Sequence, residues 1–149
     1  MRKILVLLLC VIIALPLVAC GGIEVGEKSP YDVVNDFEYA SMKVLEVSDE
    51  NQVTVEFSYT GEHELTYGEY FEIEMLRDGS WYQLENNSNL SYFDIAYVVA
   101  PGKTSTKLYA AGVYGNLPTG QYRIIVEVHD FIGTGNYAEH ILAAEFVKE

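Results

Sequence analysis

Residues 53–59 read Val-Thr-Val-Glu-Phe-Ser-Tyr, and their pattern indicates the class of fold. Its apolar side chains stand at every second position, which is the pattern of a β-strand with one face against a core and the other toward water. Valine, phenylalanine and tyrosine also favour strands. The same alternation recurs over residues 71–75 and 122–128. We therefore predict an all-β domain in which each of these segments is a half-buried strand.

Five less regular segments also have the composition of strands. They are residues 42–47, 81–84, 95–99, 104–109 and 141–147. Turn-forming residues separate the predicted strands, and Asp78-Gly79 is a strong signal for a two-residue hairpin turn. Seven to eight short strands at this spacing predict an antiparallel β-sandwich.

Three residues are assigned structural roles. Tyr122 follows a Pro/Gly turn at the start of a strand, which is the setting of a tyrosine corner, where the hydroxyl bonds to the backbone a few residues upstream. Gly120 belongs to that turn. Trp81 follows a hairpin turn, and we place it in the core or at its rim.

The amino terminus has the organisation of a secretory signal peptide. Arg2 and Lys3 precede an apolar run over residues 4–18, and small residues surround Ala19. The run is shorter than the roughly 20 apolar residues of a membrane-spanning helix, and no positive cluster follows it. We predict that residues 1–19 are a cleaved signal peptide rather than a transmembrane anchor.

The residues around the predicted cleavage point resemble the lipobox of bacterial lipoproteins. Leu17-Val18-Ala19-Cys20 places leucine three residues before the cysteine and a small residue directly before it. The resemblance implies that Cys20 carries a diacylglycerol with acyl chains such as palmitate and becomes the first residue of the mature chain. Each buried CH₂ contributes about 0.8 kcal/mol to membrane binding. We expect a lipid-anchored protein on the extracytoplasmic face of the cell membrane.

Removal of the signal peptide leaves a strongly acidic chain. Without Arg2 and Lys3, seven basic residues remain against 22 acidic ones, a net charge of −15. Nucleic-acid binding needs clustered lysine and arginine, so we expect no nucleic-acid partner. Cys20 becomes the only cysteine, which excludes an intramolecular disulfide and a cysteine-based metal site.

Several separated motifs resemble a bacterial Ig-like domain found in secreted and membrane proteins of Gram-positive bacteria. They are Tyr67-Gly68-Glu69-Tyr70-Phe71-Glu72-Ile73-Glu74, Asp78-Gly79-Ser80-Trp81-Tyr82, Phe93-Asp94-Ile95-Ala96-Tyr97, Pro101-Gly102 and Tyr114-Gly115-Asn116-Leu117-Pro118-Thr119-Gly120-Gln121-Tyr122-Arg123. The resemblance covers about residues 42–148. It implies an immunoglobulin-like sandwich without an inter-sheet disulfide, with no catalytic residues and no cofactor.

These observations divide the chain into three parts. Residues 1–19 are the signal peptide, residues 20–41 are the lipidated cysteine and a tether, and residues 42–149 are the Ig-like β-sandwich. The tether is rich in glycine and polar residues at its start. Residues 31–37 form either a short helix or an extended linker.

Local catalytic motifs are missing from the sequence. It contains no Gly-x-Ser-x-Gly elbow and no Ser-x-x-Lys, and its histidines do not have metal-helix spacing. A cluster able to hold a metal would form across a hairpin from four residues, His129, Asp130, Glu139 and His140. Such residues are common at hairpin ends without a ligand, so we assign no metal.

The chain has twelve tyrosines, a large number for its length. A sugar- or peptide-binding surface would be able to use Tyr82, Tyr92, Tyr97, Tyr109 and Tyr114. Half-buried tyrosine is also normal in β-sandwiches, and we favour that interpretation.

The primary prediction for function is a non-enzymatic, lipid-anchored cell-surface module for binding, sensing or envelope interaction. Its partner would be an extracellular or envelope protein or a glycan. A carbohydrate- or peptide-binding receptor lipoprotein is the alternative, and a metal-dependent enzyme is the third hypothesis.

Overall fold

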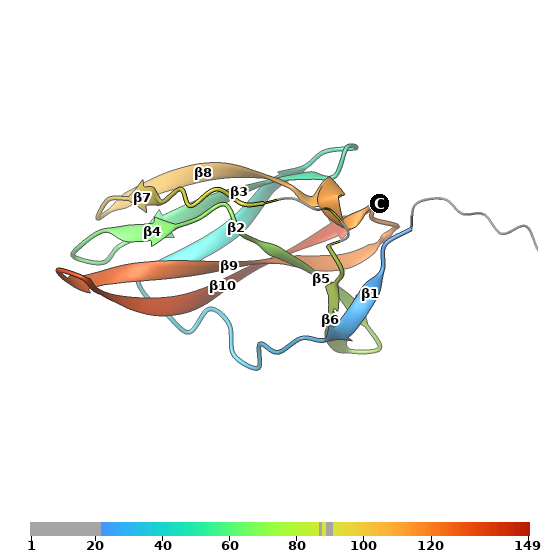
Figure 1. Ribbon diagram of the computed structural model, residues 1–149, viewed down its shortest axis with the longest axis horizontal. Helices are drawn as coiled ribbons and strands as arrows, with labels where there is room; N and C mark the ends of the chain where they lie inside the picture. Colours follow the sequence, from blue (N-terminus) through green and yellow to red (C-terminus); the bar gives the residue numbers. More distant parts are fainter. Residues whose placement is uncertain (1–21, 87, 89–90) are drawn as a thin grey trace, which may run out of the picture.

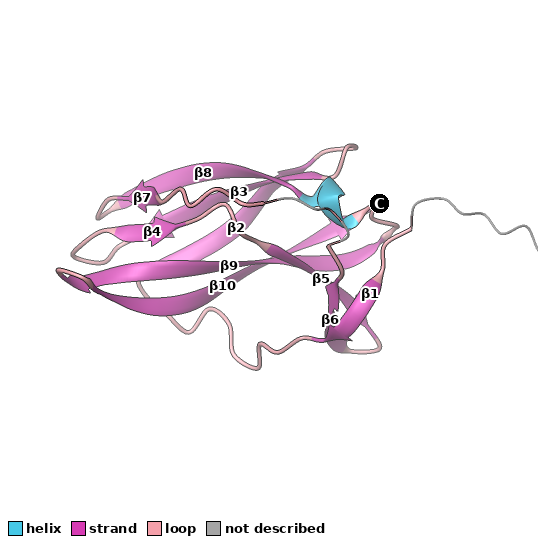
Figure 2. Ribbon diagram, in the orientation of Figure 1, coloured by secondary structure: helices cyan, strands magenta, loops and turns pink. Residues whose placement is uncertain are grey.

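The computed structural model describes residues 22–86, 88 and 91–149, and these residues form ten strands and one short 3-10 helix (Figures 1 and 2). In chain order the elements are β1 (Val25–Lys28), β2 (Ala40–Val47), β3 (Gln52–Tyr59), β4 (Leu65–Tyr67), β5 (Glu72–Arg77), β6 (Ser80–Leu84), β7 (Tyr97–Val99), β8 (Lys103–Ala110), η1 (Ala111–Tyr114), β9 (Gly120–Gly133) and β10 (Asn136–Lys148). The prediction of an all-β fold is confirmed. The described part of the chain holds no helix with the length and apolar character needed to cross a membrane.

The strands form two antiparallel sheets (Figure 1). The smaller sheet has the order β2-β3-β8, and the larger one has the order β1-β6-β5-β9-β4-β7 with β10 also paired to β9. Because β10 pairs with β9 from Gly120 to Gly133, β5 and β4 share the opposite edge of β9. There β5 pairs with residues 122–125 and β4 with residues 128–130.

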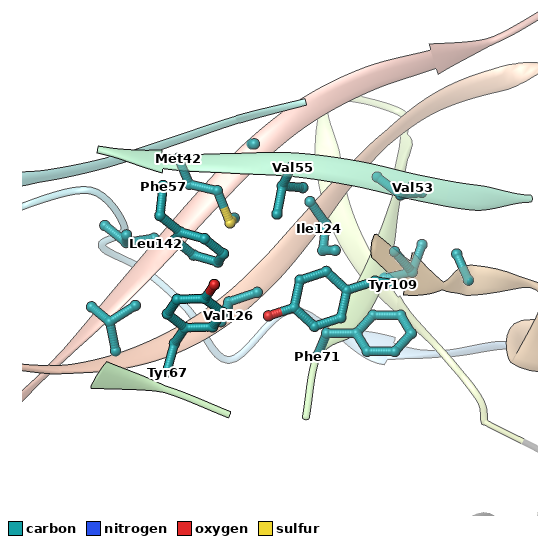
Figure 3. Packing of buried hydrophobic residues seen from close by; sticks show 14 of the residues in the cluster. Met42, Val53, Val55, Phe57, Tyr67, Phe71, Tyr109, Ile124, Val126 and Leu142 are labelled. Carbon is teal, nitrogen blue, oxygen red and sulfur yellow. The ribbon is translucent and has the colours of Figure 1, made fainter. Parts of the chain in front are cut away.

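Alternating side chains from both sheets fill the space between them (Figure 3). Val53, Val55 and Phe57 of β3 are fully buried, and they belong to one cluster with Ile124 and Val126 of β9. Each such side chain contributes about 1.5–3 kcal/mol relative to full exposure. The period of two predicted from the sequence is therefore the period of burial in the structure.

Buried tyrosines bring hydroxyl groups into this core, and the hydroxyls have partners. Tyr67 stacks on Phe57 with ring centroids 4.1 Å apart, and its hydroxyl lies 2.7 Å from Ser105 Oγ. The Tyr114 hydroxyl donates to the carbonyl oxygen of Phe71 at 2.8 Å. Burial raises the pKa of Tyr114 well above its usual range, so this hydroxyl stays a proton donor.

The turn between β5 and β6 is the predicted Asp78-Gly79 hairpin. Both residues have positive φ, 50° and 75°, and the flanking residues Arg77 and Ser80 pair with each other. A two-residue hairpin loop that matches the twist of its strands requires positive φ at both positions, which glycine adopts without steric cost.

The structure contains two strands that the sequence patterns did not predict. Seven to eight strands were expected, and the described residues form ten because β1 and β4 are added. β4 has three residues, too few for an alternating pattern to stand out. β1 lies in the polar, glycine-containing stretch that had been taken as part of the tether.

The prediction of a tether over residues 20–41 requires correction. β1 pairs with β6 through Val25 and Leu84, and β2 already begins at Ala40. The segment between β1 and β2 contains no helix, so of the two alternatives it is the linker, and Asn35 bonds this linker to β10. The ordered domain therefore starts near β1 rather than at residue 42.

Asn35 closes part of the outer edge of β10. Its backbone N–H donates to the Ile141 carbonyl oxygen at 2.9 Å. Its side-chain amide accepts from the Ala143 N–H at 2.8 Å and donates to the Ala143 carbonyl oxygen at 3.0 Å. The amide thus takes the place of a neighbouring strand at a position where an open edge would invite pairing with another chain.

Candidate functional site

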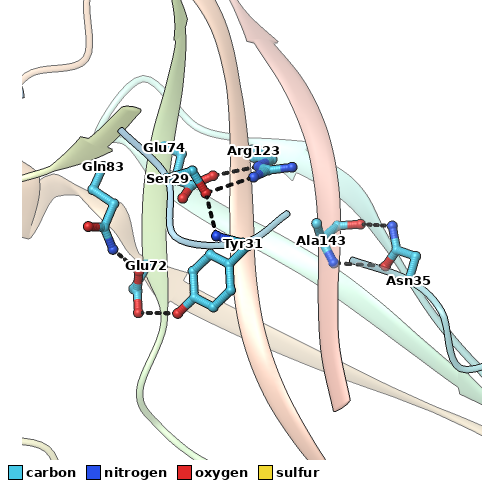
Figure 4. Close-up of polar contacts among 8 residues, drawn as sticks. All are labelled: Ser29, Tyr31, Asn35, Glu72, Glu74, Gln83, Arg123 and Ala143. Atoms are coloured by element: carbon cyan, nitrogen blue, oxygen red, sulfur yellow. Dashed lines mark hydrogen bonds and ion pairs between the residues drawn. The ribbon is translucent and has the colours of Figure 1, made fainter. Parts of the chain in front are cut away.

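The outer face of the larger sheet carries a buried ion pair beneath the N-terminal segment, residues 29–39 (Figure 4). Glu74 of β5 and Arg123 of β9 are register partners, and Arg123 Nε lies 2.5 Å from Glu74 Oε2. The Glu74 side chain is 0% exposed and that of Arg123 is 7% exposed. Arg123 also donates to Ser29 Oγ at 3.1 Å and lies over the Trp81 ring at 4.7 Å.

This ion pair was not among the residues singled out from the sequence. Its members are 49 residues apart, and no local motif connects them. Alternation along each strand does place both side chains away from the core. Only the pairing of β5 with β9, which is a long-range contact, brings them together.

Three side chains donate hydrogen bonds to Glu72 of β5, and Figure 4 shows two of them, Tyr31 and Gln83. Tyr31 and Tyr70 donate to Glu72 Oε1 at 2.7 and 3.1 Å, and Gln83 donates to Oε2 at 2.7 Å. Burial and the Glu72 carboxylate raise the pKa of Tyr31 well above its usual range and that of Tyr70 to about 12. Both hydroxyls therefore remain donors, and the Tyr31 contact attaches the N-terminal segment to the sheet.

The four residues predicted as a possible metal cluster do not come together. Asp130 lies on the other side of β9, where its carboxylate accepts from the Tyr59 hydroxyl at 2.5 Å. His140 stacks on Phe37, with ring centroids 3.9 Å apart. Successive residues of a strand point to opposite faces, so Asp130 and His140 cannot share a face with their neighbours.

A different group of three potential ligands lies on the outer face of the β9–β10 hairpin. His129 and Glu139 are register partners, and Glu127 stands two residues before His129 on the same face. One ligand atom from each of the three lies within 4.8 Å of the others. Glu127 was missed from the sequence, although the period of two along this strand would have placed it beside His129.

A hollow of about 220 Å³ borders this group. Its lining includes Glu127 and His129 together with Tyr31, Tyr70 and Glu72. Tyr31 comes from the N-terminal segment, so the ordered segment that was expected to be a tether forms one wall of the hollow. Acidic and phenolic groups dominate the lining, which favours a cation over an anion there.

Comparison with known proteins gives one match. A family described as a bacterial Ig-like domain matches residues 37–147. The chain belongs to this family. No curated protein and no solved structure matches it. Bacterial Ig-like domains usually have no catalytic role, and no enzyme family is found for this chain.

The family match covers the Ig-like domain from just before β2 to one residue before the end of β10. β1 and most of the N-terminal segment lie before the matched residues. The outer wall that this segment builds over Glu72 and Arg123 is therefore an addition to the part of the Ig-like domain that the family match describes.

A second ion pair of the Ig-like domain joins β8 to the loop before β5. Lys107 Nζ lies 2.7 Å from Glu69 Oε1 and 2.9 Å from the Tyr97 hydroxyl, which also donates to Glu69. Hydrogen bonds from Lys107 and Tyr97 lower the pKa of Glu69. Burial acts to lower the pKa of Lys107, but its bonds to Glu69 and Tyr97 outweigh burial and raise it. Both groups are therefore held in their charged forms.

The five tyrosines proposed for a sugar or peptide surface are all buried or half-buried. Tyr109 and Tyr114 are 2% and 5% exposed and belong to the core of the Ig-like domain. The other three, Tyr82, Tyr92 and Tyr97, are half-buried. This distribution agrees with the interpretation of the tyrosines as sandwich residues.

The residues assigned structural roles lie at the end of the Ig-like domain where β9 begins. The Tyr122 hydroxyl donates to the Pro118 carbonyl oxygen at 2.7 Å, the contact expected of a tyrosine corner. A Cβ added to Gly120 would lie 3.5 Å from the Tyr122 ring, an ordinary van der Waals distance, so the space around this position does not require glycine. Trp81 is half-buried at the rim beneath Arg123.

The structural description begins after the predicted lipid attachment site. Leu17, Val18, Ala19 and Cys20 lie outside the described residues, as does the rest of the predicted signal peptide.

Proposed function

We propose that the mature chain is a lipid-anchored Ig-like module on the extracytoplasmic face of the cell membrane, where it binds a protein or glycan partner and catalyses no reaction. The observation that carries this proposal is the short distance in sequence between the lipobox-like cysteine and the folded domain. Only residues 21–24 separate Cys20 from the first residue of β1. A signal-peptide cleavage site placed directly before an ordered strand suits an exported domain.

The connection between Cys20 and β1 is too short to act as a long spacer. An extended chain spans at most about 3.3–3.6 Å per residue, so five steps cover about 18 Å. A lipid on Cys20 would hold the end of the domain that carries β1 and η1 close to the bilayer. The turn between β9 and β10 lies at the opposite end of the long axis and would face outward (Figure 1).

Charge supports the need for a covalent anchor. The mature chain would carry a net charge of −15, and an anionic lipid surface repels such a protein. Acyl chains would supply the membrane association that electrostatics opposes. Two or more chains are needed for stable anchoring, which a diacylglycerol provides.

A non-catalytic binding role agrees with the polar contacts of the domain, because its buried charged side chains are paired with one another. Glu74–Arg123, the most buried ion pair of the described residues, lies beneath the N-terminal segment rather than at an open cleft. The Lys107–Glu69 pair is held by Tyr97 and bridges two parts of the domain. These groups stabilise the sandwich, and membership in a family that usually has no catalytic role points the same way.

The test is the intact mass and membrane partition of the full chain expressed in a bacterium. We expect the wild type to lose residues 1–19, to gain the mass of a diacylglycerol and to sediment with membranes. Cys20→Ala should abolish all three, whereas Cys10→Ala, which changes the other cysteine of the chain, should abolish none. Identical behaviour of the wild type and Cys20→Ala would refute the lipid anchor.

A further inference from the structure

Glu127, His129 and Glu139 project from one face of a long, regular hairpin. β9 and β10 pair from Gly120 to Gly133, so the backbone beneath the three side chains is fixed by the sheet on both strands. Directly opposite residues in an antiparallel pair have Cβ atoms about 4.5–5.5 Å apart, and diagonal neighbours about 7–8 Å. His129 stands opposite Glu139, and Glu127, two residues before His129, is the diagonal neighbour of Glu139. This spacing lets three side chains converge on one point above the hairpin.

The ligand atoms are already close to the separation that a metal ion needs. One atom from each side chain lies within 4.8 Å of the others, and His129 Nε2 is 3.2 Å from Glu127 Oε1. Bonds of about 2.0–2.2 Å to a tetrahedral Zn²⁺ place ligand atoms about 3.4 Å apart. Glu127 and Glu139 are exposed and His129 is half-buried. Small rotations of these partly exposed side chains would therefore complete the approach without moving the backbone.

Electrostatics around the group favours a bound cation. Two carboxylates whose oxygen atoms lie within 4.8 Å of each other repel when both are ionised. The hollow that borders Glu127 and His129 adds Glu72, and the described residues lining it include no lysine or arginine. A divalent ion would neutralise this concentration of negative charge. The hollow also leaves space for a water or another ligand at a fourth coordination position.

We propose that Glu127, His129 and Glu139 form a site for Zn²⁺, with the imidazole nitrogen and two carboxylate oxygens as protein ligands. One nitrogen and two oxygens suit a borderline ion such as Zn²⁺. Ca²⁺ takes six to eight oxygen ligands, and Mg²⁺ keeps several waters and prefers oxygen. The ion would link β9 to β10 across the hairpin and leave one coordination position toward the hollow. The site stands on these three residues and does not depend on the lipid anchor.

The first test is calorimetric titration of metal-stripped, detergent-purified protein with ZnCl₂. We expect one ion per chain, and His129→Ala should weaken binding by more than about tenfold, since removal even of groups that only support a ligand costs 10–100-fold. Glu139→Gln should weaken it in the same direction. Equal concentrations of Ca²⁺ or Mg²⁺ should not displace the ion.

His63→Ala is the matched control. His63 is exposed and stands between Glu62 and Glu64, so it has a similar local composition, but it does not belong to the three-residue group. Its replacement should leave the Zn²⁺ affinity unchanged. Nitrogen NMR shifts of the imidazoles should change on Zn²⁺ addition for His129 and not for His63 or His140.

Two results would overturn the proposal. One is the absence of Zn²⁺ binding to the wild type while circular dichroism shows a folded sandwich. The other is equal binding by the wild type and His129→Ala, with both proteins folded. Loss of binding in His63→Ala together with retention in His129→Ala would place the ion on the exposed turn instead and would equally reject this site.

Discussion

Arg123→Met should destabilise the domain strongly, although the substitution keeps a flexible, unbranched stem at this position. In the structure, Arg123 is the cation that compensates Glu74, whose side chain is 0% exposed. Glu74 Oε1 already has no hydrogen-bond partner among the described residues, so loss of Arg123 would leave the whole carboxylate without compensation. The same change removes the hydrogen bond to Ser29 and the contact with Trp81.

The magnitude follows from the burial of both partners. Removal of one member of a buried ion pair costs about 3–5 kcal/mol, because the other charge stays in a low-dielectric site. For a domain of this size, 1 kcal/mol corresponds to about 4 °C in Tm, so the midpoint should fall by about 12–20 °C. An exposed pair would instead contribute about 0–1 kcal/mol.

The assay is urea unfolding followed by far-UV circular dichroism, with the wild type and variants compared at one pH and salt concentration. Arg123→Lys keeps the charge but not the fork of donors, so its free energy of unfolding should lie between those of the wild type and Arg123→Met. The double variant Glu74→Leu/Arg123→Met removes both charges. Its stability should return to within about 1–2 kcal/mol of the wild type, since apolar replacement of a buried pair is often neutral.

Two outcomes would refute this reasoning. A loss below about 1 kcal/mol in Arg123→Met would mean that the pair behaves like an exposed one. A double variant as unstable as Arg123→Met would mean that lost packing, rather than the stranded Glu74 carboxylate, causes the effect.

Two further predictions concern the N-terminal segment and the Lys107 pair. Asn35→Ala should cost about 1–3 kcal/mol, because it removes two hydrogen bonds to Ala143 and leaves that position of the β10 edge open. Hydrogen exchange of the Ala143 amide should become faster, and an unchanged exchange rate would contradict the contact. Asn35→Gly also lacks the side-chain amide but suits the φ of 58°, so it should have the same effect on exchange. Glu69→Gln should make stability less sensitive to acid: the folded-state pKa of Glu69 is lowered, so its contribution is present above the ordinary pKa of 4.5 and is lost as pH falls below that value. Urea midpoints at pH 7 and pH 3.5 should therefore differ less in the variant than in the wild type, and an equal difference would argue against the Lys107–Glu69 interaction.

The features that depend on neighbouring residues could be predicted from the sequence. Alternation along residues 53–59 predicted a half-buried strand because a strand's side chains alternate between two faces, whatever lies around it. Asp78-Gly79 predicted its hairpin because the turn needs positive φ at two adjacent positions. The setting of Tyr122 was equally local, since its hydroxyl reaches a carbonyl only four residues upstream.

Contacts between distant residues, in contrast, depend on how the strands pack in three dimensions. Val25–Lys28 is a strand because it pairs with the edge of β6, and its four residues show no sequence pattern that predicts this pairing. Glu74 reaches Arg123, and Glu139 reaches His129, because particular strands are neighbours in a particular register. A shift of one residue in register would turn every side chain of a strand to the opposite face. Strand order and register arise from packing the whole core, so the buried ion pair could not be derived from any single stretch of sequence, whereas two of the three residues of the candidate metal site, His129 and Glu139, were expected to meet across one hairpin.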